Sequence, residues 1–237
     1  MSASAAPTDT PEPSPSRLAA LTGLLTAEAI FGAVLFLGAF AVFFYLVRVV
    51  FHDNSRTFDT WAINQTNLLR LAQPWTYGVL KAVTFFGSVM FFVPASLLVP
   101  LVLYRRGLGR YAIELLLSMG GGLALNELLK FYFQRARPTE ALFHQIGYSF
   151  PSGHAMMSMA YYGCLAWLVV QYSHRWGVAT ALVCFALLIG FTRVYFHVHY
   201  ATDVVAGFCG GAAWLVLLRT GIRLFWKEKK EVEAAVE

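Results

Sequence analysis

The chain has 237 residues, of which 58% are hydrophobic and only 13% are charged. Charged residues make up about a quarter of an ordinary soluble domain, so this composition predicts a protein of the lipid bilayer. The net charge of +5 is spread in short clusters between apolar runs, which argues against nucleic acid as a partner.

The two ends of the chain are expected to lie outside the folded domain. Residues 1–22 are rich in Ser, Ala, Thr and Pro and predict a flexible cytoplasmic tail, because they contain too little apolar surface to bury. A cleavable signal peptide is not expected, since Arg17 comes late and a run long enough to span follows it. We expect one six-span domain over residues 23–226 and a charged cytoplasmic tail over residues 227–237.

A helix that spans a bilayer needs roughly 20 largely apolar residues. Six segments meet this requirement, so the expected fold class is an all-α integral membrane protein with a bundle of six transmembrane helices. The spans are expected at residues 27–50, 79–104, 111–131, 153–172, 177–196 and 201–222. The stretch 52–77 is more polar, and its large hydrophobic residues predict an amphipathic segment in the first outward loop. These residues are Trp61, Leu68, Leu69, Leu71 and Trp75.

Two further patterns inside the spans suggest packing and not chemistry. Cys164, Cys184 and Cys209 lie in apolar segments without paired spacing, so neither a disulfide framework nor a zinc site is predicted. The run Gly120–Gly122 lies in the middle of the third span, where it favours close helix packing. A glycine loop that holds phosphate would instead stand at the start of a helix.

Three groups of polar residues remain once the apolar spans are set aside, and all three map to the outward ends of helices. They occupy residues 130–138, 151–154 and 192–203. Taken singly, each group suits a helix cap or an anchor at the membrane interface. Taken together, they place two histidines, several cations and a carboxylate at one level of the membrane. Ionisable groups are costly there unless they are used, so the set predicts a functional site.

The residue types in this set suit phosphoryl transfer, which needs fixed cations, a nucleophile and an acid for the leaving oxygen. His199 and Asp203 are four residues apart, so on a helix they share one face. A carboxylate that accepts a proton from one ring nitrogen leaves the other nitrogen free to attack. We therefore expect His199 to be the nucleophile, oriented by Asp203. His154, at a helix start, is the expected proton donor.

The three groups resemble the signature motifs of the type 2 phosphatidic acid phosphatase (PAP2) superfamily. These are Lys, six residues, Arg-Pro; then Pro-Ser-Gly-His; then Ser-Arg, five residues, His, three residues, Asp. The six-span layout is also similar to the membrane branch of that family. In this chain the motif positions are Lys130, Arg137, Pro138, Pro151, Ser152, Gly153, His154, Thr192, Arg193, His199 and Asp203.

The resemblance implies a role for each matching position. It implies that three cations bind phosphate, with Ser152 and the backbone of Gly153 assisting. The cations are Lys130, Arg137 and Arg193. It also implies that His199 forms a phosphohistidine, and that His154 protonates the leaving group and then activates water. One position departs from the pattern, because the usual serine is replaced by Thr192. The hydroxyl is retained, but the extra methyl group makes Thr192 a weaker ligand assignment than Ser152.

Three neighbouring residues lie outside the motif positions. The expected role of Arg135 is anchoring at the membrane interface, with a contribution to the phosphate pocket as the alternative. Glu127 lies one turn before Lys130 and is expected to pair with it or with a neighbouring polar group. His197 and His199 alternate, but no third ligand of suitable type accompanies them, so no metal site is expected.

The count of Lys and Arg residues indicates how the spans are oriented. Ten lie on the side that carries both termini and eight on the other; without Lys130, Arg137 and Arg193 the count is ten against five. We therefore expect cytoplasmic termini in the plasma (inner) membrane and an active site at the outer face.

The resulting hypothesis is an integral membrane phosphatase that hydrolyses a lipid phosphate or diphosphate without a metal or other cofactor. Polyprenyl diphosphates, phosphatidylglycerol phosphate and phosphatidic acid all suit a site beside the headgroups, and the sequence does not choose among them. It also indicates no oligomeric state. A lipid phosphotransferase of the same superfamily is the alternative.

Two other function classes fit less well. Vanadate-dependent haloperoxidases share the three motifs but are soluble helical proteins, and the apolar spans argue against that class. A non-catalytic anion transporter would need cations along a path through the bilayer, whereas these lie at one level.

Overall fold

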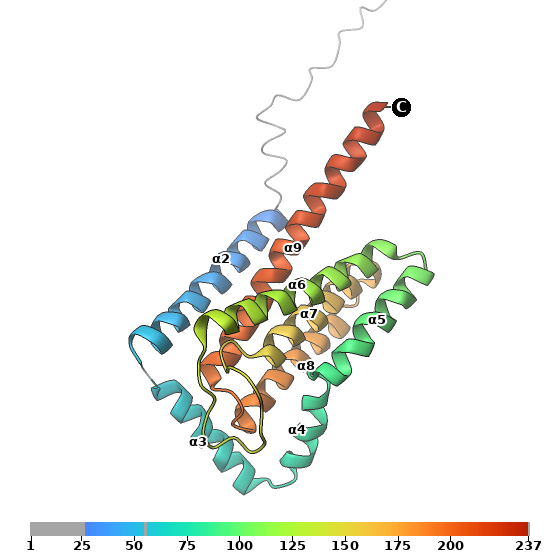
Figure 1. The fold of residues 1–237 in the computed structure, drawn as a ribbon. Helices are drawn as coiled ribbons and strands as arrows, with labels where there is room; N and C mark the ends of the chain where they lie inside the picture. Colours follow the sequence, from blue (N-terminus) through green and yellow to red (C-terminus); the bar gives the residue numbers. More distant parts are fainter. Residues whose placement is uncertain (1–26, 55, 237) are drawn as a thin grey trace, which may run out of the picture.

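The computed structural model describes residues 27–54 and 56–236, and every regular element within these ranges is a helix (Figure 1). Helices suit this apolar chain because each satisfies its own backbone hydrogen bonds in lipid. The elements are α2 (Ala27–Val47), the π-helical turn η1 (Arg48–His52), α3 (Thr57–Ala72), α4 (Thr76–Phe85), α5 (Val89–Arg105), α6 (Gly109–Phe133), α7 (Gly153–Ser173), α8 (Trp176–Tyr195) and α9 (Ala201–Val236). The tail predicted at residues 1–22 lies outside the described residues, and α9 continues through the second predicted tail.

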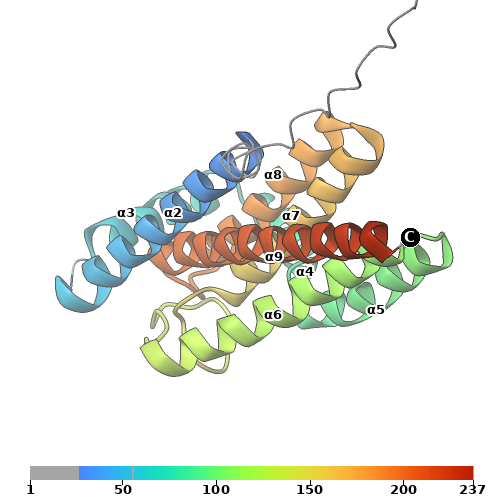
Figure 2. The ribbon, with the colours of Figure 1, turned by 90° about the horizontal axis from the view of Figure 1, so that it is seen from above.

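Helix α7 lies inside the bundle and packs against α6, α8 and α9 (Figures 1 and 2). Helix α5 packs on α6, and α2 packs on α9. Helices α3 and α4 lie at one end of the bundle, together with the loop of residues 134–152 that joins α6 to α7 (Figure 1). The end of α6, the start of α7 and the turn between α8 and α9 meet at this end, so the fold gathers the three polar groups.

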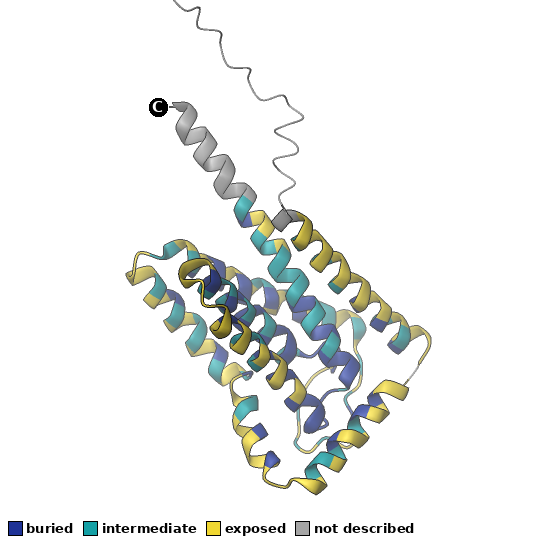
Figure 3. Cartoon of the chain, turned by 180° about the vertical axis from the view of Figure 1, so that it is seen from behind, coloured by how far each residue is buried: buried dark blue, intermediate teal, exposed yellow. Residues whose placement is uncertain are grey.

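Among the described residues, four helices are long and apolar enough to cross a membrane. They are Ile30–His52, Gly109–Phe133, Trp176–Tyr195 and Ala201–Arg223. Helices α4 and α5 pass the same test together as one bent span, which raises the number to five. The outer helices α2 and α5 have many exposed residues (Figure 3), and many of these are large and hydrophobic. Such extensive apolar surface requires lipid around it, so the chain is an integral membrane protein.

Helix α7 matches the fourth predicted span in position but not in apolarity. It is not among the candidate spans, although it is 21 residues long. Most of its length is buried, including the polar Ser158 and the tyrosines Tyr161 and Tyr162. A helix enclosed by other helices presents little surface to lipid, so small and polar residues are tolerated along it.

The second predicted span, residues 79–104, is wrong as one continuous helix. Helix α4 ends at Phe85 and α5 begins at Val89, with a bend of 45° between them. The side chain of Ser88 caps α5 by accepting a hydrogen bond from the Phe91 N–H at 3.4 Å. A Cβ on Gly87 would overlap the Ile189 side chain. The break therefore brings this span into close contact with α8, beside the first turn of α7.

Small residues allow the inner helices to approach closely. A Cβ on Gly207 in α9 would lie 2.6 Å from the carbonyl oxygen of Ser152. A Cβ on Gly121 in α6 would overlap the indole of Trp214 in α9, and one on Gly122 would lie 3.3 Å from the Cβ of Ala160 in α7. The prediction that this glycine run permits close helix packing is confirmed at two of its three positions.

Helix α3 has two different faces. Its Trp61, Leu68 and Leu71 are exposed, whereas Asp59 and Thr66 are buried against the bundle. The exposed apolar residues are those expected of a helix that lies along a membrane surface. The buried polar residues point instead to contacts with the end of the bundle that holds the polar groups.

Candidate active site

The short turn between α8 and α9 positions His199, which is only 2% exposed. Its Nδ1 lies 2.8 Å from the backbone carbonyl oxygen of Ser149 and 3.5 Å from Oδ2 of Asp203. A carbonyl oxygen can only accept, so Nδ1 carries the proton and Nε2 keeps its lone pair. Asp203 is thus close to His199 as expected, but the nearer acceptor is a backbone carbonyl on the α6–α7 loop.

The surroundings of His199 favour its neutral form. Burial lowers its pKa from 6.5 to about 4; Asp203 opposes this shift, and the positive charges of Arg137 and Arg193 add to it. The imidazole is therefore uncharged near neutral pH, which is the form that can attack. Its Nε2 accepts a hydrogen bond from Nη1 of Arg137 at 3.1 Å, so this lone pair faces a cation.

Arg137 lies in the α6–α7 loop, where backbone carbonyls fix its guanidinium. Nη1 donates to the carbonyl oxygen of Val198 at 2.8 Å, and Nε donates to that of Gly147 at 2.9 Å. Burial lowers the pKa of Arg137, and Asp203 raises it. An arginine stays protonated in proteins, so Arg137 is a fixed cation directly beside Nε2 of His199.

Arg193 comes from the last turn of α8 and is 1% exposed. Its Nη1 donates to the hydroxyl of Thr84 in α4 at 2.8 Å. Its Nε and Nη2 are buried without a hydrogen-bond partner in the described part of the chain. Buried donors without a partner are costly, so they indicate a place for an anion. Thr84 lies outside the motif positions, and no local sequence pattern indicates this contact.

The start of α7 contributes the second polar group. Ser152 stands at the N-cap, but its hydroxyl makes no capping bond and is buried without a partner among the described residues. A Cβ on Gly153 would lie only 3.5 Å from Nζ of Lys130, so the lysine lies against this helix start. The unpaired N–H groups of a first helical turn attract anions. The start of α7 and the Lys130 ammonium therefore form a second region that attracts anions, beside that of Arg137 and Arg193.

Lys130 also confirms a sequence prediction, because its Nζ lies 3.6 Å from Oε1 of Glu127. His154 follows Gly153 and lies against the break between α4 and α5, where a Cβ on Gly87 would be 2.9 Å from its ring. The charges of His199 and of three cations act on His154, so these groups lie near one another. The cations are Lys130, Arg137 and Arg193.

The expectation that Arg135 anchors the membrane interface is wrong. Its side chain is only 11% exposed, and it bridges two buried carboxylates. Nη1 donates to Oδ1 of Asp203 at 2.5 Å, and Nη2 donates to Oδ2 of Asp59 at 2.8 Å. The guanidinium also lies 4.0 Å from the ring centre of Tyr200. Asp59 comes from α3, 76 residues earlier, so no local pattern could indicate this pairing.

Two candidates from the third group point away from the site. The hydroxyl of Thr192 donates to the carbonyl oxygen of Ile189 in its own helix at 2.5 Å. The ring of His197 lies 3.3 Å from the hydroxyl of Thr66 in α3. Burial lowers the pKa of His197, and Arg70 adds to this. Within the described ranges, no three His, Cys, Asp or Glu residues are grouped so as to hold a metal ion.

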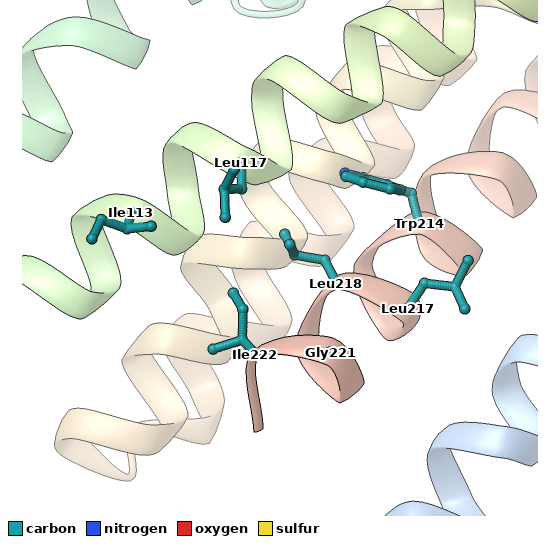
Figure 4. A pocket seen from close by; sticks show the side chains of 7 residues that line it. All are labelled: Ile113, Leu117, Trp214, Leu217, Leu218, Gly221 and Ile222. Carbon is teal, nitrogen blue, oxygen red and sulfur yellow. The ribbon is translucent and has the colours of Figure 1, made fainter. Parts of the chain in front are cut away.

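One cavity of about 410 Å³ lies between α6 and α9, toward the end of α6 opposite Lys130 (Figure 4). Ile113, Leu117, Trp214 and Leu218 form most of its walls, and no titratable group lines it. An apolar cavity of this kind offers nothing to a phosphoryl group. The polar end of the bundle is therefore the candidate active site.

Comparison with known proteins supports the same region. The family model of the PAP2 superfamily matches residues 111–227, which contain all three polar groups. Phosphatidylglycerophosphatase B of Bacillus subtilis is 31% identical over 186 residues, which cover 75% of this chain and 90% of that protein. The chain belongs to the PAP2 superfamily.

Other PAP2 proteins extend the likeness to the fold. The lipid A 1-phosphatase of Rhizobium johnstonii is 33% identical over 129 residues, 49% of this chain and 48% of that protein. The crystal structure of a transmembrane PAP2-type phosphatidylglycerolphosphate phosphatase from Bacillus subtilis superposes with a TM-score of 0.72 and 28% identity. The match covers 82% of this chain and 96% of that one. This PAP2 protein is thus a membrane-embedded hydrolase of the lipid phosphatase family.

Proposed function

We propose that this PAP2 protein hydrolyses a lipid phosphate or diphosphate through a phosphohistidine on His199, with phosphatidylglycerol phosphate as the first substrate to test. The observation that carries the proposal is the direction of His199: Nδ1 is tied to the Ser149 carbonyl, and Nε2 faces Arg137. The unpartnered donors of Arg193 and Ser152 support it, because they can bind phosphoryl oxygens. The similarity to phosphatidylglycerophosphatase B supports the choice of substrate.

The reaction takes two steps in which bonds and protons balance. In the first, Nε2 of His199 attacks phosphorus, the bond to the lipid oxygen breaks, and protonated His154 gives its proton to that oxygen. In the second, neutral His154 takes a proton from water, and the water oxygen bonds to phosphorus. The phosphorus–nitrogen bond then breaks and returns its electron pair to His199. Arg137 and Arg193 stabilise the phosphoryl oxygens in both steps.

We also propose that the chain crosses the membrane six times, counting α7 and the bent pair of α4 and α5. Cytoplasmic termini and an outer active site follow from the count of ten Lys and Arg residues against five. The exposed Trp61 and Leu71 of α3 would then lie in the outer interface. In a variant without the native cysteines, His144→Cys should react with an impermeant maleimide added outside intact cells. Labelling only after the cells are opened would reverse this orientation.

The first experiment measures phosphate release by purified protein in detergent with EDTA. The substrates are phosphatidylglycerol phosphate, phosphatidic acid and a polyprenyl diphosphate. His199→Ala should abolish release, whereas the exposed His52→Ala should match the wild type. Release that survives in His199→Ala would overturn the mechanism.

The covalent intermediate can be tested with an aryl phosphate, whose leaving group needs no acid. His154→Gln should then give a burst of phenol, because dephosphorylation still needs a base. The trapped phosphoenzyme should be labile to acid and absent in His199→Ala. A lipid or sugar acceptor that takes up the phosphoryl group faster than water does would favour the phosphotransferase alternative.

A further inference from the structure

Each oxygen of the Asp203 carboxylate has a separate set of partners. Oδ2 accepts the backbone N–H of Tyr200 at 3.0 Å and lies 3.5 Å from Nδ1 of His199. Oδ1 accepts from Nη1 of Arg135 at 2.5 Å. Since Asp203 is fully buried, its orientation against His199 depends on these contacts. Arg135 therefore fixes the oxygen that faces away from the nucleophile.

Arg135 is itself held by a residue from another element. Oδ2 of Asp59 in α3 accepts from Nη2 of Arg135 at 2.8 Å and from the hydroxyl of Thr202 at 2.9 Å. Oδ1 of Asp59 accepts the backbone N–H of Thr202 at 2.9 Å. Because it accepts this N–H in the first turn of α9, Asp59 caps that helix from another element. Its side chain is buried, with 1% exposed. Both its oxygens are used at the turn that carries the nucleophile.

We propose that Asp59 and Arg135 are positioning residues, which hold the Asp203 carboxylate and through it the attacking imidazole of His199. This role rests on the phosphohistidine chemistry proposed above. Helix α3 covers the end of the bundle and contains no motif residue. Through Asp59 it would nevertheless affect the rate of the reaction. A guanidinium suits the task because its planar fork can bind two carboxylates at once.

A purely structural ion pair would stabilise the packing of α3 on α9 but would leave kcat of the folded enzyme unchanged. The charges near His199 come from every surrounding element. They are Lys130, Arg135, Arg137, His154, Arg193 and Asp203, with Asp59 acting through Arg135. The loss of kcat without a change in KM therefore separates the two roles, and the acid limb of the pH profile of kcat/KM reports the charges around His199 in the free enzyme.

The test measures kcat, KM and the acid limb for Arg135→Gln and Asp59→Asn with phosphatidylglycerol phosphate. Arg135→Gln should lower kcat about 10- to 100-fold with little change in KM, because orientation is lost and not substrate binding. Its acid limb should move up by about half a pH unit or more, since a positive charge has been removed. For Asp59→Asn, which removes a negative charge, the limb should move down.

Matched controls come from the exposed ion pair of Arg48 with Asp53, whose atoms lie 3.7 Å apart. Arg48→Gln and Asp53→Asn make the same chemical changes and should leave all three quantities at their wild-type values. Arg135→Lys keeps the charge but cannot hold both carboxylates, so kcat should fall while the acid limb stays in place. If Arg135→Gln does not fold, Asp59→Asn and Arg135→Lys decide the question.

The failure of this role differs from the failure of the proposed function. A wild-type protein without phosphatase activity, or an active His199→Ala variant, would defeat both. An active wild type and a dead His199→Ala, together with wild-type kcat in Arg135→Gln and Arg135→Lys, would defeat the positioning role alone.

Discussion

Arg193→Lys tests whether the two unpartnered donors of Arg193 serve the phosphoryl group. The wild-type side chain uses Nη1 for Thr84 and leaves Nε and Nη2 free. Lysine keeps the charge but offers one nitrogen, which cannot reach Thr84 and also replace two donors. Loss of a single oxyanion donor lowers kcat by about 10²- to 10³-fold, or roughly 3 to 4 kcal/mol. We expect a loss of at least this size, with a smaller change in KM.

The measurement is single-turnover phosphate release from phosphatidylglycerol phosphate, compared with two variants. Arg175→Lys makes the same change at the exposed N-cap of α8 and should behave as wild type. Thr84→Val removes the acceptor of Nη1 but keeps both free donors, so we expect a loss of only about 10-fold. A rate for Arg193→Lys within about threefold of wild type would refute this reasoning. Equal losses in Arg193→Lys and Thr84→Val would assign the effect to the Thr84 contact.

Three further predictions follow from other contacts. Because burial lowers the pKa of His199 from 6.5 to about 4, the unfolded state binds an extra proton between these values. The free energy of unfolding that neutral His199 contributes is fully present above pH 6.5. About 3 kcal/mol of it, from roughly 2.5 pH units at about 1.4 kcal/mol each, should be lost by pH 4. Denaturant titrations of His199→Gln should show a smaller loss over the same range. Gly207→Ala should lower the free energy of unfolding by about 1 to 3 kcal/mol and should also lower kcat, because its Cβ would clash with the Ser152 carbonyl oxygen. A Cβ on Gly221 has nothing within 4 Å, so Gly221→Ala should change neither quantity. Thr192→Ser should change kcat less than twofold, since the hydroxyl bonds within its own helix, and a large loss in the same assay would show that it contacts substrate.

The positions of most helices could be predicted because length and apolarity alone determine them. Departures arise where contacts between helices override composition. The apolar run of the second span continues through Phe86 to Ser88, yet Ser88 caps a new helix and Gly87 packs on α8. Conversely, the modest apolarity of α7 reflects its enclosure by α6, α8 and α9. Neither effect is visible in a sum of residue hydropathies.

The motif residues could be identified because their spacing is local, and the fold does bring them together. The partners that orient them could not. Asp59 meets Arg135 across 76 residues, and Ser149 holds His199 through a backbone oxygen that carries no side-chain signal. Thr84 meets Arg193 across 109 residues. A sequence pattern can thus identify the candidate reactive groups, whereas the residues that orient them depend on tertiary contacts between helices.

These contacts also divide the cations of the site into two kinds. Arg135 is bound by two buried carboxylates, Asp59 and Asp203, so its charge is compensated within the protein. Arg193 has no carboxylate within 4.0 Å among the described residues, and neither has Arg137, although burial makes an isolated charge costly. A phosphoryl dianion would supply the missing negative charge and accept the free donors of Arg193. The proposed preference for a phosphate group therefore has a physical basis, because in the described part of the chain Arg137 and Arg193 lack the carboxylate partners that Arg135 has.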